Sequence, residues 1–225
     1  MARAVRNARN ANKRGERMRI GIIGSGNIGS VTARLFVGAG HEVAIANSRG
    51  PDTLTGLVGS LGERARAATG KEAAAFGEVV VVAIPFGRYR NLPADELEGK
   101  IVADATNYYP PRDGNIPALD SGQMASSQLL ALRLDGASVV KVFNTLYAGT
   151  LASAGRPDAP LDQRLAVFVA ADDPDAKKVV SGLVEQIGFA PVDAGSLADS
   201  RRQQPGAPLY GARLKQPEAA AALRS

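Results

Sequence analysis

The chain has 225 residues, of which 45% are hydrophobic, no cysteine, and a formal net charge of +5. This composition predicts a globular protein with one large domain, and it excludes disulfides and cysteine-based metal or nucleophile sites. The longest apolar run, residues 79–86, is far too short to cross a bilayer. We therefore expect no membrane contact and, by default, a cytoplasmic location.

The positive charge is concentrated in residues 1–17, which hold six basic side chains and one acid. Of the 27 basic and 22 acidic residues in the chain, 21 of each remain from Met18 onward, so we expect no nucleic-acid partner. The segment could be a basic arm, a targeting segment, or the result of a start codon placed too early. We favour the last interpretation, because Met18 opens a typical first strand, and we expect a disordered tail.

An apolar strand at residues 20–23 leads into a glycine-rich turn and then a helix-like segment at residues 27–37. In this context a GxGxxG pattern predicts a dinucleotide site. The first glycine permits the tight bend, the second lets the backbone approach a pyrophosphate, and the third lets the helix pack closely. The helix N-terminus would face the phosphates with free amides and its positive dipole end. The six candidate residues are Gly24, Ser25, Gly26, Asn27, Ile28 and Gly29.

The second strand, residues 41–46, ends at Asn47, where an NAD site would carry a carboxylate for the ribose hydroxyls. A carboxylate would repel a phosphate on that ribose. By contrast, the Ser48 hydroxyl can donate to a phosphate and the Arg49 guanidinium can bind it with paired, charge-assisted bonds. We therefore expect NADP(H) as the cofactor, although Arg49 could instead be a solvated loop charge.

The remaining chain alternates between helix and strand patterns, which predicts an α/β, Rossmann-type, doubly wound, mainly parallel sheet. We assign residues 18–195 to this NADP-binding domain. Residues 196–225 would form a short C-terminal helical segment, too small for a core of its own, that could pack on a partner subunit of a homodimer. The expected helices are 51–61, 71–76, 92–97, 125–132 and 175–187, and the expected strands are 64–68, 78–85, 100–106, 137–143, 165–171 and 189–194.

Ligands of open parallel sheets lie beyond the carboxyl ends of the strands. We therefore expect Ile84, Pro85 and Phe86, which end one strand, and Asn107, which follows another, to border the nicotinamide. Asn107 also opens a long loop, residues 107–122, of the kind that often carries function. Two aromatic residues of this loop, Tyr108 and Tyr109, could stack on a planar ring or anchor the loop.

The sequence shows no acid or base for carbonyl reduction, because it contains neither a YxxxK motif nor a lysine directly after the last strand. The only histidine, His41, precedes a strand at the end opposite the cofactor, so we expect a structural or solvated role. Asp172, Asp173 and Asp175 are typical of a helix cap, and we expect no metal site. These absences favour hydride transfer between two cofactors, which needs mainly proximity and orientation and no catalytic side chain.

These motifs resemble the NADPH-dependent coenzyme F420 reductases, through the glycine turn, Asn47-Ser48-Arg49, Ala83-Ile84-Pro85 and residues 167–201. The likeness covers nearly everything from residue 18 to 202. It implies that hydride passes between the nicotinamide and the stacked deazaflavin ring of F420. It also implies a role for each of several residues: Ser25, Asn27 and Ile28 would line the pyrophosphate and ribose, Ser48 and Arg49 would hold the extra phosphate, and Ile84, Pro85, Leu146 and Ala148 would border the rings.

A second likeness involves Asn107-Tyr108-Tyr109-Pro110, the Ser126-Ser127 helix and residues 140–145. These segments resemble the cytosolic oxidoreductase domain of the STEAP metalloreductases, which passes electrons from NADPH to a flavin. The resemblance implies FMN or FAD as the alternative acceptor, in a soluble flavin or ferric reductase. A protein that binds NADPH only as a sensor also remains open. In either redox case the partner is a small-molecule acceptor.

Overall fold

The protein is described by a computed structural model that covers residues 17–224. Of the basic segment at residues 1–17, only Arg17 lies within the described residues, so the expectation of a disordered tail falls outside them.

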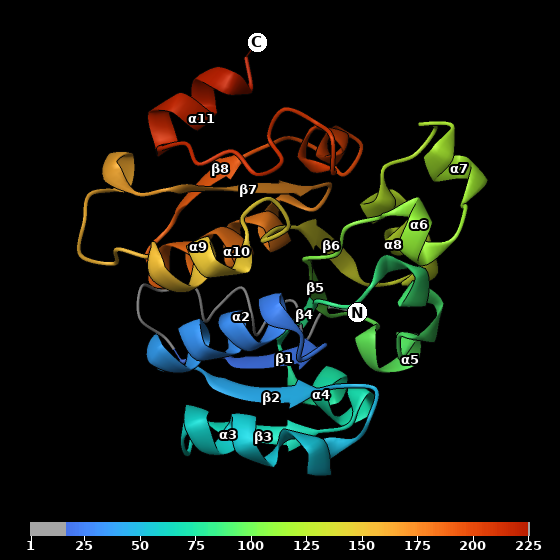
Figure 1. The fold of residues 1–225 in the computed structure, drawn as a ribbon, viewed down its shortest axis with the longest axis vertical. Coiled ribbons are helices and arrows are strands. Elements are labelled where there is room, and N and C mark those ends of the chain that lie inside the picture. Colours follow the sequence, from blue (N-terminus) through green and yellow to red (C-terminus); the bar gives the residue numbers. More distant parts are fainter. Residues whose placement is uncertain (1–16, 225) are drawn as a thin grey trace.

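Eight strands form one sheet in the order β3-β2-β1-β4-β5-β6-β7-β8 (Figure 1). The first six strands are parallel, β7 runs antiparallel to β6, and β8 is parallel to β7. The predicted Rossmann-type, mainly parallel sheet is therefore confirmed, and the late strands do extend it, with their direction reversed. The strands are β1 (Arg19–Ile23), β2 (Glu42–Ala46), β3 (Ala65–Ala68), β4 (Val79–Val82), β5 (Ile101–Asp104), β6 (Ser138–Lys141), β7 (Ala166–Ala171) and β8 (Ala190–Asp193).

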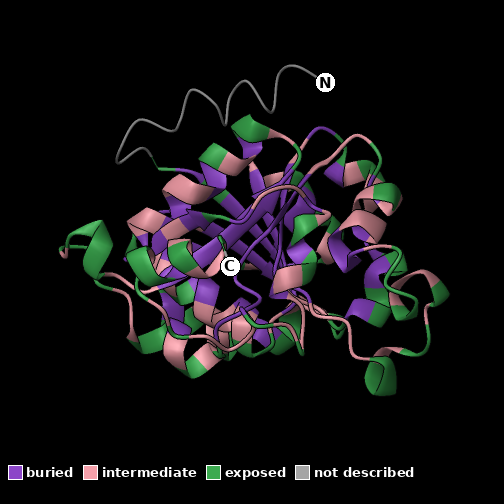
Figure 2. Ribbon diagram, turned by 90° about the horizontal axis from the view of Figure 1, so that it is seen from above, coloured by how far each residue is buried: buried purple, intermediate pink, exposed green. Residues whose placement is uncertain are grey.

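Helices cover both faces of the sheet, and the strands are buried between them (Figure 2). Side chains alternate along each strand, so that in β1 Ile20 and Ile22 pack with α2, α3, α9 and α10, whereas Ile23 faces α4, α5 and α8. The helices are α2 (Asn27–Gly38), α3 (Thr55–Leu61), α4 (Gly70–Phe76), α5 (Ala94–Leu97), α6 (Pro110–Asp113), α7 (Pro117–Asp120), α8 (Ser126–Arg133), α9 (Ala148–Ser153), α10 (Pro174–Gln186) and α11 (Gln216–Ala222). The 3-10 helices are η1 (Pro51–Leu54), η2 (Phe86–Asn91), η3 (Leu161–Gln163) and η4 (Asp199–Gln203).

Two expected segments differ in detail from the structure. The loop at residues 107–122 carries the single-turn helices α6 and α7, each begun by a proline whose fixed φ suits the first helical position. The helix expected at residues 92–97 is shorter, since α5 begins at Ala94. It is preceded by the 3-10 helix η2, which begins directly after Pro85. Two of these short helices, α6 and η2, lie beside each other at the carboxyl edge of the sheet.

The C-terminal segment packs on the sheet of its own chain. Leu209 and Ala219 are buried with β7 and β8 residues, among them Phe168 and Val192. This cluster covers the face of β7 and β8 opposite to the one on which α10 packs. Intramolecular packing therefore accounts for the burial of this segment.

His41 is buried in a structural role, and Asp173 and Asp175 lie at the start of α10 as predicted, whereas Asp172 instead accepts a hydrogen bond from the Leu197 N–H. The His41 side chain is 1% exposed, its Nδ1 accepts from the Met18 N–H at 3.1 Å, and its Nε2 lies 2.6 Å from Gln186 Oε1. Asp173 caps α10, because its Oδ1 accepts from the N–H groups of Asp175 and Ala176. His41 thus ties the start of β1 and of β2 to α10 at the amino edge of the sheet, opposite the edge where we expect the cofactor.

Within residues 17–224, no helix has the length and apolar character needed to span a bilayer.

Candidate functional site

The glycine turn after β1 is held so tightly that two of its positions admit no side chain. Gly24 has a φ of +112°, and a Cβ there would collide with the Ala83 carbonyl at the end of β4. A Cβ on Gly29 would collide with the Gly24 carbonyl oxygen. The Gly24 N–H donates to the Ala46 carbonyl at 2.9 Å, which joins the turn to β2. The third glycine thus permits close packing of α2 on the turn itself.

The second glycine has a different environment. Gly26 is exposed, and a Cβ built on it would meet nothing within 4 Å. Gly26 is the N-cap of α2, and the described residues place neither a side-chain cap nor an acid in the first turn of that helix. The first N–H groups of α2 and its positive dipole end therefore face open space, which is the arrangement that binds a pyrophosphate. Asn27 is exposed and Ser25 and Ile28 are partly exposed, so all three are accessible beside it.

A pocket of about 580 Å³ lies at the carboxyl ends of β1, β2 and β4. It brings together six of the predicted residues, which are Gly24, Ser25, Asn47, Ser48, Ile84 and Pro85. Its position matches the crevice of a doubly wound sheet where the strand order reverses, here between β1 and β4. A larger hollow of about 720 Å³ lies at the amino ends of β2 and β3, around Arg64 and Glu42, on the wrong edge for a dinucleotide.

Asn47 organises the loop after β2. Its Nδ2 donates to Thr53 Oγ1 at 2.9 Å, and its Oδ1 accepts from the Arg49 N–H at 2.9 Å. The carboxamide therefore stabilises the turn that presents Ser48 and Arg49. Both of these side chains are exposed, and no hydrogen bond or ion pair of the Arg49 guanidinium occurs within residues 17–224. The structure thus leaves both groups available to a phosphate.

Arg88 and Asn91, which the sequence analysis did not single out, also line the pocket. They lie on η2, opposite Ser48, and both side chains are exposed. An arginine there adds a second positive charge to the adenosine side and offers a planar face for stacking on a base. The sequence signal was weak, because arginine in a segment after a strand is usually only solvated.

On the nicotinamide side, two predicted residues belong to the core. Phe86 is fully buried, stacked on Tyr89 with ring centroids 5.0 Å apart, so its side chain supports the site from below and cannot line it. Leu146 is 4% exposed and packs in the core cluster that includes α2. Ala148 begins α9, which contacts α2, and is partly exposed. The side chains of Phe86 and Leu146 are thus buried, contrary to the expectation that they border the nicotinamide, because each packs in the core instead.

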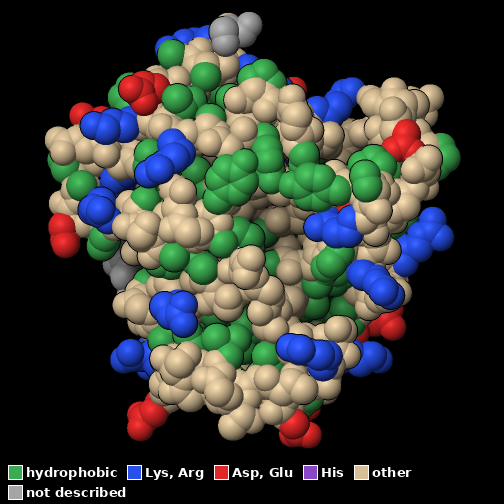
Figure 3. All heavy atoms as spheres, viewed as in Figure 1, with side chains coloured by type: hydrophobic (Ala, Val, Ile, Leu, Met, Phe, Trp, Pro, Cys, Tyr) green, Lys and Arg blue, Asp and Glu red, His purple; other side chains and the backbone are tan. Residues whose placement is uncertain are grey.

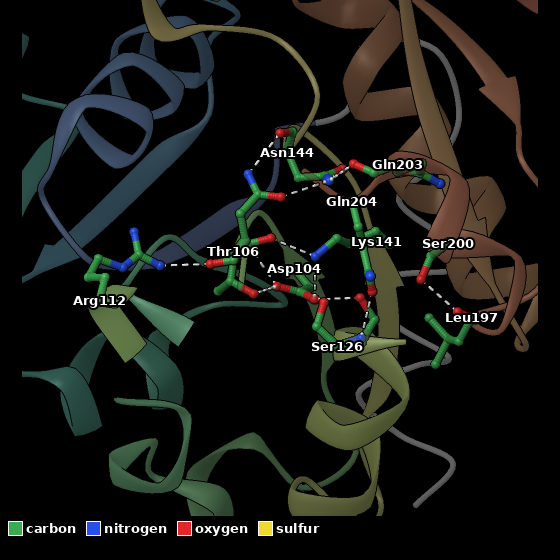
Figure 4. Close-up of polar contacts among 12 residues, drawn as sticks. Asp104, Thr106, Arg112, Ser126, Lys141, Asn144, Leu197, Ser200, Gln203 and Gln204 are labelled. Carbon is green, nitrogen blue, oxygen red and sulfur yellow. Dashed lines mark hydrogen bonds and ion pairs between the residues drawn. The ribbon is translucent and has the colours of Figure 1, made fainter. Parts of the chain in front are cut away.

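Asn107 joins the ends of β5 and β6. Its Nδ2 donates to the Asn144 carbonyl at 2.9 Å, and its Oδ1 accepts from Asn144 Nδ2 at 3.2 Å. The same Asn144 nitrogen donates to the Gln203 carbonyl at 2.8 Å (Figure 4). Asn144 Oδ1 and both side-chain polar atoms of Gln203 are buried and find no partner in the described part of the chain. Buried polar groups of this kind are normally satisfied by ordered water or a ligand.

Beneath these amides lies a buried ion pair that the sequence analysis missed. Asp104 of β5 and Lys141 of β6 are paired in register and fully buried, with Lys141 Nζ 3.1 Å from Asp104 Oδ2 (Figure 4). Ser127 Oγ donates to the same oxygen at 2.6 Å, and Lys141 Nζ also donates to the Thr106 carbonyl at 2.6 Å. Burial lowers the pKa of Lys141, and the Asp104 carboxylate opposes that shift. The pair faces no solvent, so its role is to fix the segment that leads to Asn107.

Tyr108 is an anchor of the loop. Its hydroxyl oxygen lies 2.6 Å from Asp120 Oδ1 and accepts from the Ile116 N–H at 3.0 Å. Its ring packs edge to face on Phe86 at 5.9 Å. Of the two alternatives for the tyrosine pair, anchoring therefore holds for Tyr108, whereas Tyr109 makes a different set of contacts.

Comparison with known proteins connects this geometry to a family. The model of the family "NADP oxidoreductase coenzyme F420-dependent" matches residues 19–108. Metalloreductase STEAP3 of Rattus norvegicus is 33% identical over 188 residues, which are 83% of this chain and 36% of that protein. The chain spans about a third of the length of the curated relatives it matches.

Two crystal structures extend the likeness to nearly the whole fold. The hypothetical protein SMa0349 of Sinorhizobium meliloti is 34% identical with a TM-score of 0.74, over 92% of this chain and 98% of its own. A candidate F420-dependent NADP-reductase of Arthrobacter sp. FB24 is 25% identical with a TM-score of 0.67, over 82% of this chain and 87% of its own. The comparisons therefore support the likeness to the coenzyme F420-dependent NADP oxidoreductases over residues 19–108, and the chain is similar to the STEAP3 metalloreductase over most of its length.

Proposed function

We propose that this protein transfers hydride between NADPH and a deazaflavin such as coenzyme F420, or a flavin. The observation that carries the proposal is the make-up of the pocket at the ends of β1, β2 and β4. It joins an uncapped helix N-terminus to a loop without a carboxylate at the ribose position, and its lining contains no Asp, Glu, His, Lys or Tyr. Such a pocket suits a phosphorylated dinucleotide and supplies no proton to a carbonyl substrate.

The chain's own residues would bind and orient the NADPH. The amides at the start of α2 would receive the pyrophosphate, where Gly26 leaves space for it. Ser48 and Arg49 would hold the phosphate on the adenosine ribose, and Arg88 would cover the adenosine from η2. Ile84 and Pro85 would direct the nicotinamide along the sheet edge toward β5 and β6.

The chemistry itself belongs to the two rings. Bound in this pocket, NADPH would supply a hydride, with two electrons and one proton, and the acceptor ring would take up the hydride with its negative charge. No acid or base of the protein is needed for that exchange, so the protein contributes proximity, orientation and exclusion of water. Deazaflavin and flavin both meet this requirement, and likeness to the STEAP3 metalloreductase supports the flavin alternative.

Stopped-flow absorbance at the NADPH band tests the proposal, with coenzyme F420, FMN and FAD offered separately. We expect at least one acceptor to accelerate NADPH oxidation, and NADH to be oxidised more slowly with the same acceptor. If NADPH binds tightly but none of the three acceptors is reduced, the enzyme proposal fails and an NADPH sensor becomes the better account.

A further inference from the structure

Three tyrosines from separate parts of the chain meet at the ends of β5 and β6. Tyr109 follows β5, Tyr147 follows β6, and Tyr210 comes from the C-terminal segment. The hydroxyl oxygens of Tyr109 and Tyr210 lie 2.5 Å apart. The rings of Tyr147 and Tyr210 meet edge to face, with centroids 6.2 Å apart and planes at 77°. The three rings therefore form one connected aromatic group on the edge where the dinucleotide pocket also opens.

The group is fixed to the sheet from two sides. The Gly211 N–H donates to the Thr145 carbonyl at 2.9 Å, which places Tyr210 beside the end of β6. Arg112 lies with its guanidinium carbon 4.9 Å from the centre of the Tyr109 ring and donates to the Asn107 carbonyl at 2.7 Å. Since Asn107 is itself joined to Asn144, the aromatic group and the ends of β5 and β6 are held together.

The group leaves ring surface unused. The Tyr147 residue is 63% exposed, and the other large hydrophobic residues exposed in residues 17–224, Leu132 and Leu161, lie in α8 and η3. Figure 3 shows hydrophobic side chains along the upper rim of a central hollow on this face of the molecule. The exposed ring of Tyr147 offers a stacking surface for a flat ligand.

The group also leaves one hydrogen-bond donor unused. Each phenol carries one O–H, and the 2.5 Å contact between Tyr109 and Tyr210 uses only one of the two. The other hydroxyl hydrogen has no acceptor among the residues that the structure describes. Burial and the Tyr109 contact raise the pKa of Tyr210, so the phenol remains a donor at neutral pH. A ligand carbonyl oxygen next to the pair would accept this hydrogen.

We propose that Tyr109, Tyr147 and Tyr210 form a clamp for the tricyclic ring of the hydride acceptor, with Tyr147 stacking on the ring and the phenol pair donating to a ring carbonyl. This inference rests on the proposed function and assigns the residues that hold the second ring. Arg112, whose guanidinium is paired with the Asp113 carboxylate at 2.7 Å, would hold the Tyr109 ring of the clamp in place. Flavins and deazaflavins share the flat ring and the carbonyl groups that such a clamp requires.

The test measures binding, separately from turnover. FMN and coenzyme F420 are both fluorescent, so each is titrated with the protein while its emission is recorded. Tyr147→Ala should weaken binding of whichever compound the wild type binds by about tenfold, as expected for the loss of one stacked ring, whereas Tyr147→Phe should bind normally. Tyr210→Phe removes a hydroxyl and should weaken binding several-fold while keeping the ring. Leu132→Ala, an equally exposed position on α8, should have no effect.

NADPH binding by the same variants distinguishes the two proposals. We expect the NADPH affinity of Tyr147→Ala to equal that of the wild type, because the adenosine pocket lies at the ends of other strands. If the wild type binds and reduces FMN or F420 and Tyr147→Ala binds them equally well, the clamp is wrong and the enzyme proposal stands. If the wild type binds NADPH but neither FMN nor F420, both proposals are overturned.

Discussion

The carboxyl edge of the sheet has two sides, one at the ends of β1, β2 and β4 and one at the ends of β5 and β6, and they are built in different ways. The side formed by β1, β2 and β4 presents mainly backbone, namely the glycines of the turn and the free amides of α2. The side chain of Arg49, which lies there, has no hydrogen-bond partner within the described residues. The side formed by β5 and β6 presents side chains that are already bonded to one another, from the Asp104 and Lys141 pair up to Asn107 and Asn144.

This difference reflects what each side would have to recognise. The phosphates of a dinucleotide always have the same shape. The backbone amides and the dipole at one helix N-terminus can bind them, and no side chains from distant parts of the chain are needed. A second ring must be placed against the nicotinamide to within a fraction of an ångström, which requires rigid supports. The buried ion pair and the amide pair supply that rigidity. The comparison leads to four predictions, of which the first alters the β5 and β6 side and the others test the dinucleotide side and the amino edge.

The largest effect is expected for the buried ion pair. Lys141→Met would leave the Asp104 carboxylate buried and unpaired, at a cost of about 3 to 5 kcal/mol in the free energy of unfolding. Urea denaturation measures the loss. In the molecules that remain folded, NADPH affinity should change by no more than about twofold, because that pocket lies at other strand ends.

The double variant Asp104→Leu/Lys141→Met is the control for this pair. Removing both charges should cost less than removing the lysine alone, since no unpaired charge remains. If Lys141→Met unfolds at the wild-type urea concentration, the pair does not hold β5 to β6 in the way proposed.

The phosphate-binding role of Arg49 predicts the next largest effect. Arg49→Ala should weaken the binding of NADPH by about 1.5 to 3 kcal/mol, the scale of a charged hydrogen bond, and leave the binding of NADH little changed. Isothermal titration with both cofactors measures this. Arg88→Ala is the matched variant, because a residue that covers the adenosine should affect both cofactors alike. Equal losses for NADPH and NADH in Arg49→Ala would refute its phosphate role.

Gly26→Ala separates binding from folding on the backbone side. The added methyl meets no protein atom within 4 Å, so the stability should stay within about 0.5 kcal/mol of the wild type. It would project into the space where the pyrophosphate approaches, and we expect NADPH to bind about tenfold more weakly. Gly38→Ala, at the other end of α2 and equally free of contacts, should bind NADPH normally. Undiminished binding by Gly26→Ala would place the phosphates elsewhere.

The smallest effect concerns His41 at the amino edge. Burial lowers the pKa of His41 below its unfolded value of 6.5, so protonation favours the unfolded chain. Stability should therefore be complete above about pH 6.5 and fall as the pH decreases below it, with a slope of at most about 1.4 kcal/mol per pH unit for one proton. Urea unfolding between about pH 7.5 and 5 measures the slope. His41→Asn should reduce the slope, and an unchanged slope would mean that other groups cause it.

Much of the dinucleotide side could be predicted because its signals are local. Gly24, Gly26 and Gly29 lie within six residues of one another, directly after an apolar strand, so one short stretch of sequence carries the whole signal. The strand pattern likewise predicted the sheet, including its last two strands. What the pattern could not show was the reversal of β7, since a strand buried on both faces has the same apolar run in either direction.

The other side depends on pairs that are distant in sequence. Asp104 and Lys141 are 37 residues apart, and Tyr109 and Tyr210 are 101 apart. Each residue alone has an ordinary explanation, as a strand-end polar residue or a loop aromatic, and only the folded chain brings the partners together. A charged residue inside an otherwise apolar strand, as at Lys141, is the one signal that could have indicated the pair.

The hydrogen bond from the Gly211 N–H to the Thr145 carbonyl can form only after the C-terminal segment has been synthesised. The adenosine pocket is complete within residues 23–93, whereas the tyrosine clamp needs a residue near the end of the chain. A ribosome would therefore release the nucleotide pocket well before the last clamp residue emerges.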